Sequence, residues 1–279
     1  MKILAASGQK PARSMTTSEV MTVLIYYAIC SEEFKTFKAF YKYTYNQLKS
    51  DFRGLLSYNR ITELKQEVMV PMTLFLNSIF VECDGKSFID SARIEACHIK
   101  REHSHRVLRG IARKGKTTYG WFFGTKLHAI FNEFKEIIYF CLTPGNVADN
   151  NNDLMRKFAS KIHGKLFGDK GYIVNKPLWE ELYENGLQII HHVKSNMKNM
   201  LMPIQDKIDL LKRTNICEGA FSKLKDRMSL QYTRIRSVYG YVINSLSMVI
   251  AYQLWAHERA ITLKAAKLEH LKNGAAAVV

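Results

Sequence analysis

The pattern of hydrophobic and polar positions divides the chain into three parts. From Thr16 onward, apolar residues recur at three- and four-residue spacing, which predicts amphipathic helices. The first such set is Val20, Val23, Leu24 and Ala28. Near residue 79, runs rich in Phe, Ile, Val and Tyr replace this period, and the helical period returns from about Thr214 to Leu271. We therefore expect helices, then a segment containing strands, then helices again.

Residues 15–80 read as three or four short helices. Thr16 and Glu19 form the signature of a capping box, a second helix is predicted after Ser31, and Asn59 is the predicted cap of a third that Pro71 ends or kinks. The aromatic stripe of the second helix is Phe34, Phe37 and Tyr41, with Leu48. These rings either pack the interior of a helical bundle or stack on bases beside neighbouring lysines. A helix-turn-helix-like DNA-binding module and a plain bundle both fit this segment.

The middle of the chain predicts a mixed α/β arrangement. Its expected strands are 86–94, 119–131, 136–142, 166–168 and 187–193, and its expected helices are 153–161 and 177–185. Three consecutive strands can form an antiparallel meander, and later strands then join through helical crossovers. This is the order of a ribonuclease-H-like sheet.

The predicted fold class is therefore α/β, with a ribonuclease-H-like mixed-sheet catalytic domain preceded by a small all-helical domain. The predicted divisions are a flexible N-terminus at 1–14, a helical DNA-binding region at 15–80, the catalytic domain at 81–260 and a helical or disordered tail at 261–279.

Charge points to a polyanionic partner. The 279 residues include 41 Lys and Arg against 25 Asp and Glu, a formal net charge of +16. Such a surface attracts nucleic acid first and an anionic membrane second, while a generic basic surface is the plain alternative. The five cysteines form no C-x-x-C pair, and His98, His103 and His105 have no matching ligand spacing, so we expect neither a zinc site nor a disulfide framework.

The chain shows no targeting or membrane-spanning pattern. Its most apolar window, Val242 to Leu254, is too short and too polar to cross a bilayer, and no signal-peptide pattern opens the sequence. We expect a prokaryotic cytoplasmic protein associated with the nucleoid and not with a membrane.

Three acidic residues are candidates for metal binding. Asp90 and Asp169 each end an apolar run, and Glu218 lies on a predicted helix. Ligands bind outside strand ends in open α/β sheets, and in the predicted order of strands those that carry the two aspartates should be neighbours. Carboxylates are the ligands that Mg²⁺ prefers, and a pair of Mg²⁺ ions can drive phosphoryl transfer on DNA. For each acid alone, a turn cap or solvated surface position is the alternative.

A basic stretch follows Asp90 and is a candidate DNA contact. Its cations are Lys100, Arg101, Arg106, Arg109, Arg113, Lys114 and Lys116. Several phosphate contacts would make binding strongly salt-dependent, and a solvated loop is the alternative. Further candidates for phosphate contact are Lys126, His128, Lys170 and Lys225, the last lying seven positions after Glu218 and hence on the same helix face.

An ordered series of motifs resembles one known family. The series is Phe88–Ser91, Cys97–His98, Arg109–Lys116, Gly120–His128, Leu142–Asp149, Gly164–Tyr172, Lys198–Pro203 and Arg234–Ser237. Over residues 15–255 it is similar to bacterial insertion-sequence DDE transposases, of the insertion-sequence family nine-eighty-two.

The resemblance implies a ribonuclease-H-like domain whose two aspartates and glutamate map onto Asp90, Asp169 and Glu218 and bind two Mg²⁺ ions, which Mn²⁺ can replace. It implies cleavage of double-stranded DNA at transposon ends and joining of the 3′-hydroxyl to target DNA, in a complex that is a homodimer or larger. The alternatives are a catalytically inactive, transposase-derived DNA-binding protein and a metal-dependent nuclease without strand transfer. A basic membrane-surface protein ranks behind both.

Overall fold

The structure is a computed structural model, and it describes residues 15–52, 54–118, 120–192, 202–228, 230–231, 235 and 237–276, with side chains as far as residue 266. The predictions for residues 1–14, for Val193 and for 277–279 lie outside the described residues, as do 198–201, 234 and 236 of the motifs.

The chain forms two compact units. The first comprises Met1–Ile79, Arg106–Gly110 and Lys223–Tyr252, and the second comprises Phe80–His105, Ile111–Ser222 and Gln253–Val279. None of the helices in the described ranges combines the length and the apolar character needed to span a membrane.

The N-terminal part of the first unit is helical. Its elements are α2 (Thr17–Ile29), α3 (Phe37–Gln47), η1 (Lys49–Asp51), α4 (Tyr58–Leu64) and α5 (Met69–Ile79). The capping box of Thr16 and Glu19 is confirmed at the start of α2. Two local predictions are wrong. Ser57, not Asn59, caps α4, and Pro71 lies in the first turn of α5, where the missing N–H leaves no helical hydrogen bond unmade.

The aromatic residues of these helices pack against one another. Phe40 is fully buried, and its ring lies 5.5 Å from Tyr26, 5.4 Å from Tyr27 and 5.7 Å from Phe34, centroid to centroid. Such contacts between aromatic rings stabilise a core beyond the area that they bury. These aromatic residues therefore stabilise the interior of the first unit.

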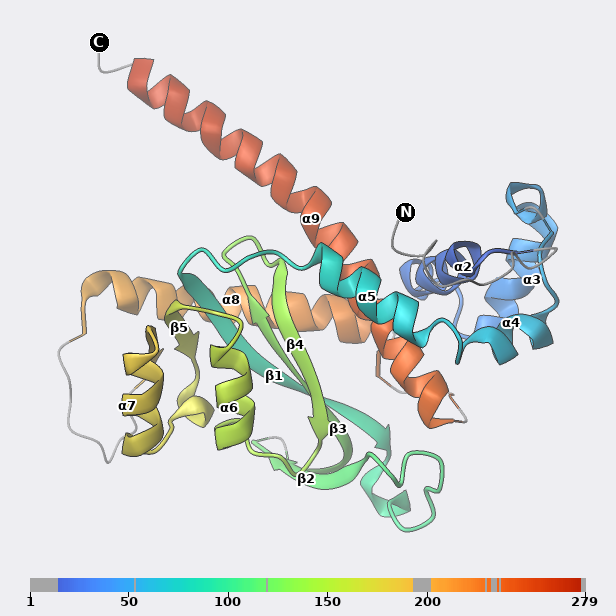
Figure 1. Ribbon diagram of the computed structural model, residues 1–279, viewed down its shortest axis with the longest axis horizontal. Helices are drawn as coiled ribbons and strands as arrows, with labels where there is room; N and C mark the ends of the chain where they lie inside the picture. The colour runs from blue at the N-terminus through green and yellow to red at the C-terminus, as the bar shows by residue number, and fades with distance from the viewer. Residues whose placement is uncertain are drawn as a thin grey trace. The chain divides into compact units, whose positions relative to one another are not determined.

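The second unit is built on a six-stranded mixed sheet (Figure 1). Its strands are β1 (Lys86–Cys97), β2 (Arg113–Thr117), β3 (Gly120–Phe131), β4 (Ile137–Pro144), β5 (Gly164–Gly168) and β6 (Leu187–His191). Along the sheet the order is β2-β3-β1-β5-β6, and β4 also pairs with β3. β1, β3 and β4 form the predicted antiparallel meander, while β5 and β6 join in parallel.

The sheet carries helices on both faces. They are α6 (Asn152–Ala159), α7 (Lys176–Glu184) and α8 (Ile204–Ser222), with short 3₁₀ turns η2 (Ile99–Arg101) and η3 (Lys170–Tyr172). Ile89 packs with residues of α6 and α7, and its neighbour Asp90 bonds to Arg213 of α8. Because successive strand residues point to opposite faces, α8 covers the face opposite to α6 and α7.

β2 was not predicted, because its sequence is basic and reads as loop. It forms because the aromatic residues of β3 offer a partner strand, with Lys116 paired to Trp121. Gly115 makes close packing possible here, since a Cβ at this position would clash with the backbone oxygen of Gly145.

The C-terminal helices differ in their boundaries from the predicted ones. α8 begins ten residues before Thr214, and a π-helical turn, η4 (Lys223–Arg227), follows it. The final helix, α9 (Val238–Ala276), extends past the predicted end at Leu271.

Candidate functional site

The site lies where the parallel pairing of β1 and β5 ends. β1 and β5 pair in parallel with Phe88 opposite Phe167, so Asp90 and Asp169, each two residues further on, stand at the same level. This adjacency confirms that the strands of the two aspartates are neighbours. Asp90 lies within β1, which continues to Cys97. It stands two residues beyond Phe88, the last residue of β1 that pairs with β5.

Asp90 is held by two hydrogen bonds. The backbone N–H of Ser91 donates to its Oδ1 at 2.8 Å, and Nη1 of Arg213 donates to Oδ2 at 3.0 Å. Burial raises the pKa of Asp90 to about 6, the Arg213 charge and the Ser91 bond oppose this, and the Asp169 charge adds to it. The Asp90 carboxylate thus resides in an environment that favours a nearby positive charge.

Asp169 caps the turn η3. Its Oδ1 accepts a hydrogen bond from the backbone N–H of Gly171 at 2.8 Å, and the side chain is half-buried. Lys170 beside it is exposed. A Cβ on Gly171 would lie 2.9 Å from Oδ1 of Asp169 and 3.3 Å from Oδ2 of Asp149, so a glycine here lets the two carboxylates approach.

Asp149 is a third acid of the site, and it was not among the predicted site residues. Its Oδ1 accepts hydrogen bonds from Oγ of Ser91 at 2.9 Å and from Nζ of Lys126 at 3.1 Å. Asp149 lies in the loop after β4, five residues beyond the end of that strand. Its place in the motif Leu142–Asp149, already noted in the sequence, was the signal that could have found it.

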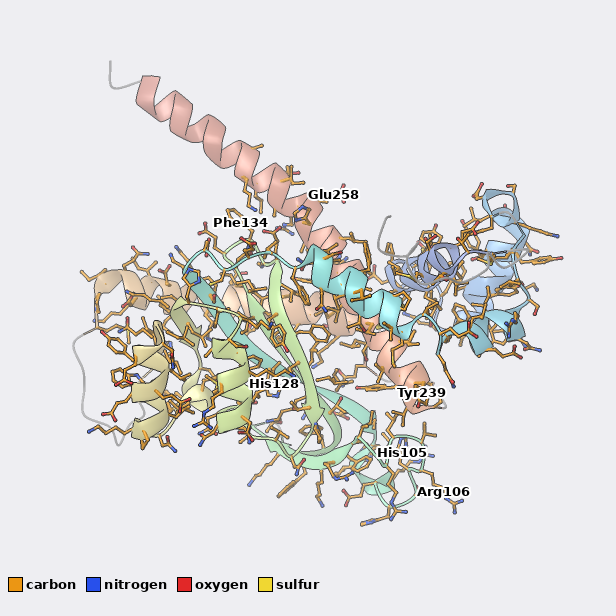
Figure 2. All side chains as sticks on the ribbon, viewed as in Figure 1. His105, Arg106, His128, Phe134, Tyr239 and Glu258 are labelled. Atoms are coloured by element: carbon orange, nitrogen blue, oxygen red, sulfur yellow. The ribbon has the colours of Figure 1, made fainter. Side chains whose placement is uncertain are left out.

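Lys126 and His128 are buried beside Asp149. Lys126 is 7% exposed and His128 is 0% exposed. Nε2 of His128 lies 3.0 Å from Oγ1 of Thr143, and Figure 2 shows the residue on β3 beside α6. Burial lowers the pKa of His128 to about 4, Asp149 opposes this and Lys126 adds to it, so the ring is neutral near pH 7. The prediction that these two residues contact DNA phosphate is at odds with their burial.

Tyr172 and Cys217 are buried near the acids. Burial raises the pKa of Tyr172, and the charges of Asp149, Asp90 and Asp169 raise it further. Its hydroxyl is buried and has no hydrogen-bond partner among the described residues. Burial likewise raises the pKa of the Cys217 thiol, with Asp90 as the next cause. Both groups are neutral and so add no charge to the acids.

Glu218 follows Cys217 on α8, and its side chain is exposed, whereas Asp90, Asp149 and Asp169 are half-buried. Arg213 and Cys217, one helical turn apart, form the face of α8 that meets Asp90. Arg213 was missed because the predicted helix began one residue after it. The predicted alignment of Glu218 with Lys225 rested on an α-helical period, which the π-helical turn η4 interrupts.

The remaining predicted DNA contacts are surface cations. Lys100, Arg101, Arg106, Arg109, Arg113, Lys114, Lys116 and Lys170 are exposed, and Lys225 is half-buried. Arg106 and Arg109 belong to the first compact unit, as does Lys225, and the others belong to the second.

The donor chemistry of Asp90 and Asp169 fits a hard divalent cation. Both offer carboxylate oxygens, the ligands that Mg²⁺ accepts while retaining water, and a cation would relieve the repulsion that raises the pKa of Asp90. Within the described ranges no cluster of three or more His, Cys, Asp or Glu side chains is arranged to hold a metal ion. The fit therefore rests on two carboxylates, with Arg213 supplying the positive charge beside Asp90.

Three comparisons relate the chain to known proteins. A search among curated proteins found no match. Among solved structures, a pre-cleavage Mos1 transpososome is similar at 11% identity over 90% of this chain and 80% of that chain, with a TM-score of 0.22, too low to support an argument about the fold. A family profile described as "Transposase DDE domain" matches residues 80–238, more than half of the 279 residues. The chain therefore belongs to the DDE transposase domain family.

Proposed function

We propose that this protein is a DNA transposase of a bacterial insertion sequence, of the nine-eighty-two type, that cleaves the transposon ends at their terminal inverted repeats and joins them to target DNA. The observation that carries the proposal is the pair Asp90 and Asp169, side by side at the parting of β1 and β5. In the proposed division of the chain, residues 81–260 form the catalytic domain and residues 15–80 the DNA-binding region.

The fold that we propose for the catalytic domain is ribonuclease-H-like. Its support is the sheet topology: an antiparallel meander of β1, β3 and β4 followed by two parallel strands beside β1. In this arrangement the parallel strand next to β1 delivers Asp169 to the same end of the sheet as Asp90.

Asp90 and Asp169 are the residues that we propose to hold Mg²⁺, which Mn²⁺ can replace. When bound, two such ions activate the attacking oxygen and stabilise the leaving oxygen of an in-line displacement on DNA phosphate. Glu218 is the third acid that we propose to bind metal, beside Asp90 and Asp169. Because it lies one residue after Cys217 on α8, this role requires α8 to turn or shift when DNA and metal bind.

The protein's own side chains prepare this site. Ser91 and Arg213 fix both oxygens of Asp90, and the Gly171 amide fixes one oxygen of Asp169. Lys170, exposed next to Asp169, is placed to contact a DNA phosphate. The exposed cations of the basic stretch extend the proposed contact with double-stranded DNA, in a complex of two or more copies.

The test is end cleavage with conservative variants. Asp90→Asn and Asp169→Asn should each abolish Mg²⁺-dependent cleavage of the flanking terminal repeats while DNA binding stays within about twofold, because the amide preserves shape but removes the metal-binding charge. The matched control is Asp153→Asn, whose side chain is 95% exposed on α6 and whose loss should leave cleavage unchanged. Full cleavage by either site variant would overturn the mechanism.

A second candidate function is DNA binding without catalysis, and one observation favours it. The Arg213 guanidinium already neutralises Asp90 at 3.0 Å, as a protein that has lost its metal would require. Incubation of the wild-type protein with terminal repeats and Mg²⁺ separates the candidates: cleaved and joined products support a transposase, cleavage without joining supports a nuclease, and binding alone supports the second candidate.

A further inference from the structure

We infer that the β2–β3 hairpin carries a binding surface for unpaired DNA bases, with Trp121 as the stacking platform and Lys114 and Lys116 as its phosphate contacts. This inference rests on the proposed DNA transposase function and names the form of DNA that one surface receives.

Trp121 is unusual among the aromatic residues of β3. It is 56% exposed, whereas Phe122 is 1% and Phe123 8% exposed. β2, its partner strand here, forms the end of the strand order and pairs only with β3. An indole this exposed beside a sheet edge leaves part of its ring available for a partner.

Two lysines of β2 flank this ring. Nζ of Lys114 lies 5.3 Å and Nζ of Lys116 lies 5.5 Å from the ring centroid, both within the range of a cation–π contact. Both lysines are exposed, and Lys116 pairs with Trp121 across the strands. An aromatic ring beside cations is the arrangement that proteins use to bind single-stranded nucleic acid, with bases on the ring and phosphates on the cations.

The plain explanation for the lysines covers only part of this surface. Lysines on an edge strand commonly prevent pairing with a second sheet. An exposed tryptophan beside them favours association instead, so this explanation does not account for Trp121. The neighbouring charge also favours a polyanion. Arg113 on β2 and Lys100 and Arg101 on η2 are exposed, and the acid opposing them is Glu102, which accepts a hydrogen bond from Lys114 at 3.2 Å.

The form of the DNA follows from the geometry of stacking. In a B-form duplex, neighbouring base pairs cover the base faces, and the grooves expose only base edges. Along the duplex, an indole can therefore stack only on a base that has left the helix, and beyond the duplex it can stack on the unpaired bases of a single-stranded end. A transposase that cuts DNA generates such ends, and Trp121 is placed to hold them.

The test compares one hairpin duplex with and without a single-stranded 3′ dT tail, using the full chain and fluorescence anisotropy. Trp121→Ala should bind the tailed duplex about tenfold more weakly, from the loss of one stacked base, and bind the blunt duplex within about twofold of wild type. Trp121→Phe should retain most of the preference for the tail. The matched control is Trp179→Ala, which removes a 37% exposed tryptophan on α7 and should change neither affinity.

Fluorescence gives a readout that does not depend on a destabilising variant. The three tryptophans are Trp121, Trp179 and Trp255, so the double variant Trp179→Phe and Trp255→Phe reports on Trp121 alone. Its emission should be quenched by oligo-dT and left largely unchanged by the blunt duplex.

Four results would overturn the inference. They are an equal loss of affinity for both duplexes, no loss for either, absence of quenching by oligo-dT, and a Trp121-dependent affinity for phosphatidylserine vesicles in place of DNA. If the wild-type protein binds neither duplex, the proposed function fails as well. If it binds and cleaves terminal repeats while Trp121→Ala behaves like wild type, only the inference fails.

Discussion

At the scale of single residues, the acids of the site are each compensated by a group of the protein itself. Asp90 accepts a hydrogen bond from the Arg213 guanidinium, and Asp169 accepts one from the backbone N–H of Gly171. Asp149 accepts one from the Lys126 ammonium. Burying a charge is costly unless it is paired and hydrogen-bonded. These hydrogen-bond partners therefore offset the free-energy cost of placing three carboxylates near the buried Tyr172.

Asp149→Asn should destabilise the protein by about 2 kcal/mol, because it leaves the Lys126 charge buried without its counterion. Lys126 has a side chain 9% exposed, and Asp149 one 24% exposed. The measurement is the free energy of unfolding from chemical denaturation at pH 7. Asp153→Asn, at an exposed position on α6, should change it by less than about 0.5 kcal/mol. Similar values for both variants would contradict a structural role for the Asp149 pair.

At the scale of elements, one buried acid joins α9 to the turn between β3 and β4. Glu136 is 0% exposed. Its Oε1 lies 2.8 Å from Nδ1 of His257, and its Oε2 lies 3.2 Å from Nζ of Lys264. Gln253 adds to the contact by accepting a hydrogen bond from the backbone N–H of Ile137 at 2.7 Å. The second half of α9 is thus fixed to the sheet by polar contacts to a single turn.

Acid should release this half of α9. Burial alone would raise the pKa of Glu136, but hydrogen bonds from Asn132, His257 and Lys264 outweigh it and leave the pKa below 4.5. A carboxyl with a depressed pKa contributes stability that is present above its unfolded pKa and is lost as pH falls through its folded pKa. Hydrogen-exchange protection of residues 254–266 should therefore be high at pH 7 and fall below about pH 4.5.

The variant Glu136→Gln should show low protection in this segment at both pH values, because it lacks the charge that His257 and Lys264 contact. Glu258→Gln is the matched control, since Glu258 is exposed on α9 (Figure 2), and it should behave as wild type. Unchanged protection in Glu136→Gln would show that apolar packing, not this acid, holds the helix.

At the scale of the whole molecule, a net charge of +16 should dominate the proposed interaction with DNA. Each phosphate neutralised by a protein cation releases a counterion, so the affinity falls with salt at a slope that counts the contacts. Exposed cations are spread over η2, β2 and the segment between them, and the slope should reflect several of them.

The double variant Lys100→Ala and Arg101→Ala should reduce the slope of log affinity against log salt by about 2. Both residues lie on η2, exposed. The measurement is a salt titration of binding to a blunt duplex. Lys161→Ala, an exposed lysine after α6, should leave the slope unchanged, and an equal reduction by this control would mean that charge acts without a defined surface.

Much of the second unit was predictable because its signals are local. Apolar runs predicted β1, β3 and β4, and their consecutive order along the chain predicted the meander. The neighbouring positions of Asp90 and Asp169 followed from strand order alone. By contrast, β2 could not be predicted, because a basic segment forms a strand here only through its pairing with the aromatic start of β3.

By itself, the sequence determined most of the elements, the basic character of the chain and the two candidate aspartates, since spacing and composition encode these within a few residues. Only the tertiary structure decided which charged side chains form ion pairs and which side chains are buried. Arg213 lies 123 positions from Asp90, Lys126 and His128 are drawn inside beside Asp149, and Trp121 is left outside. The physical reason is that burial and ion pairing depend on which elements pack together, and no local pattern records contacts between segments so far apart in the chain.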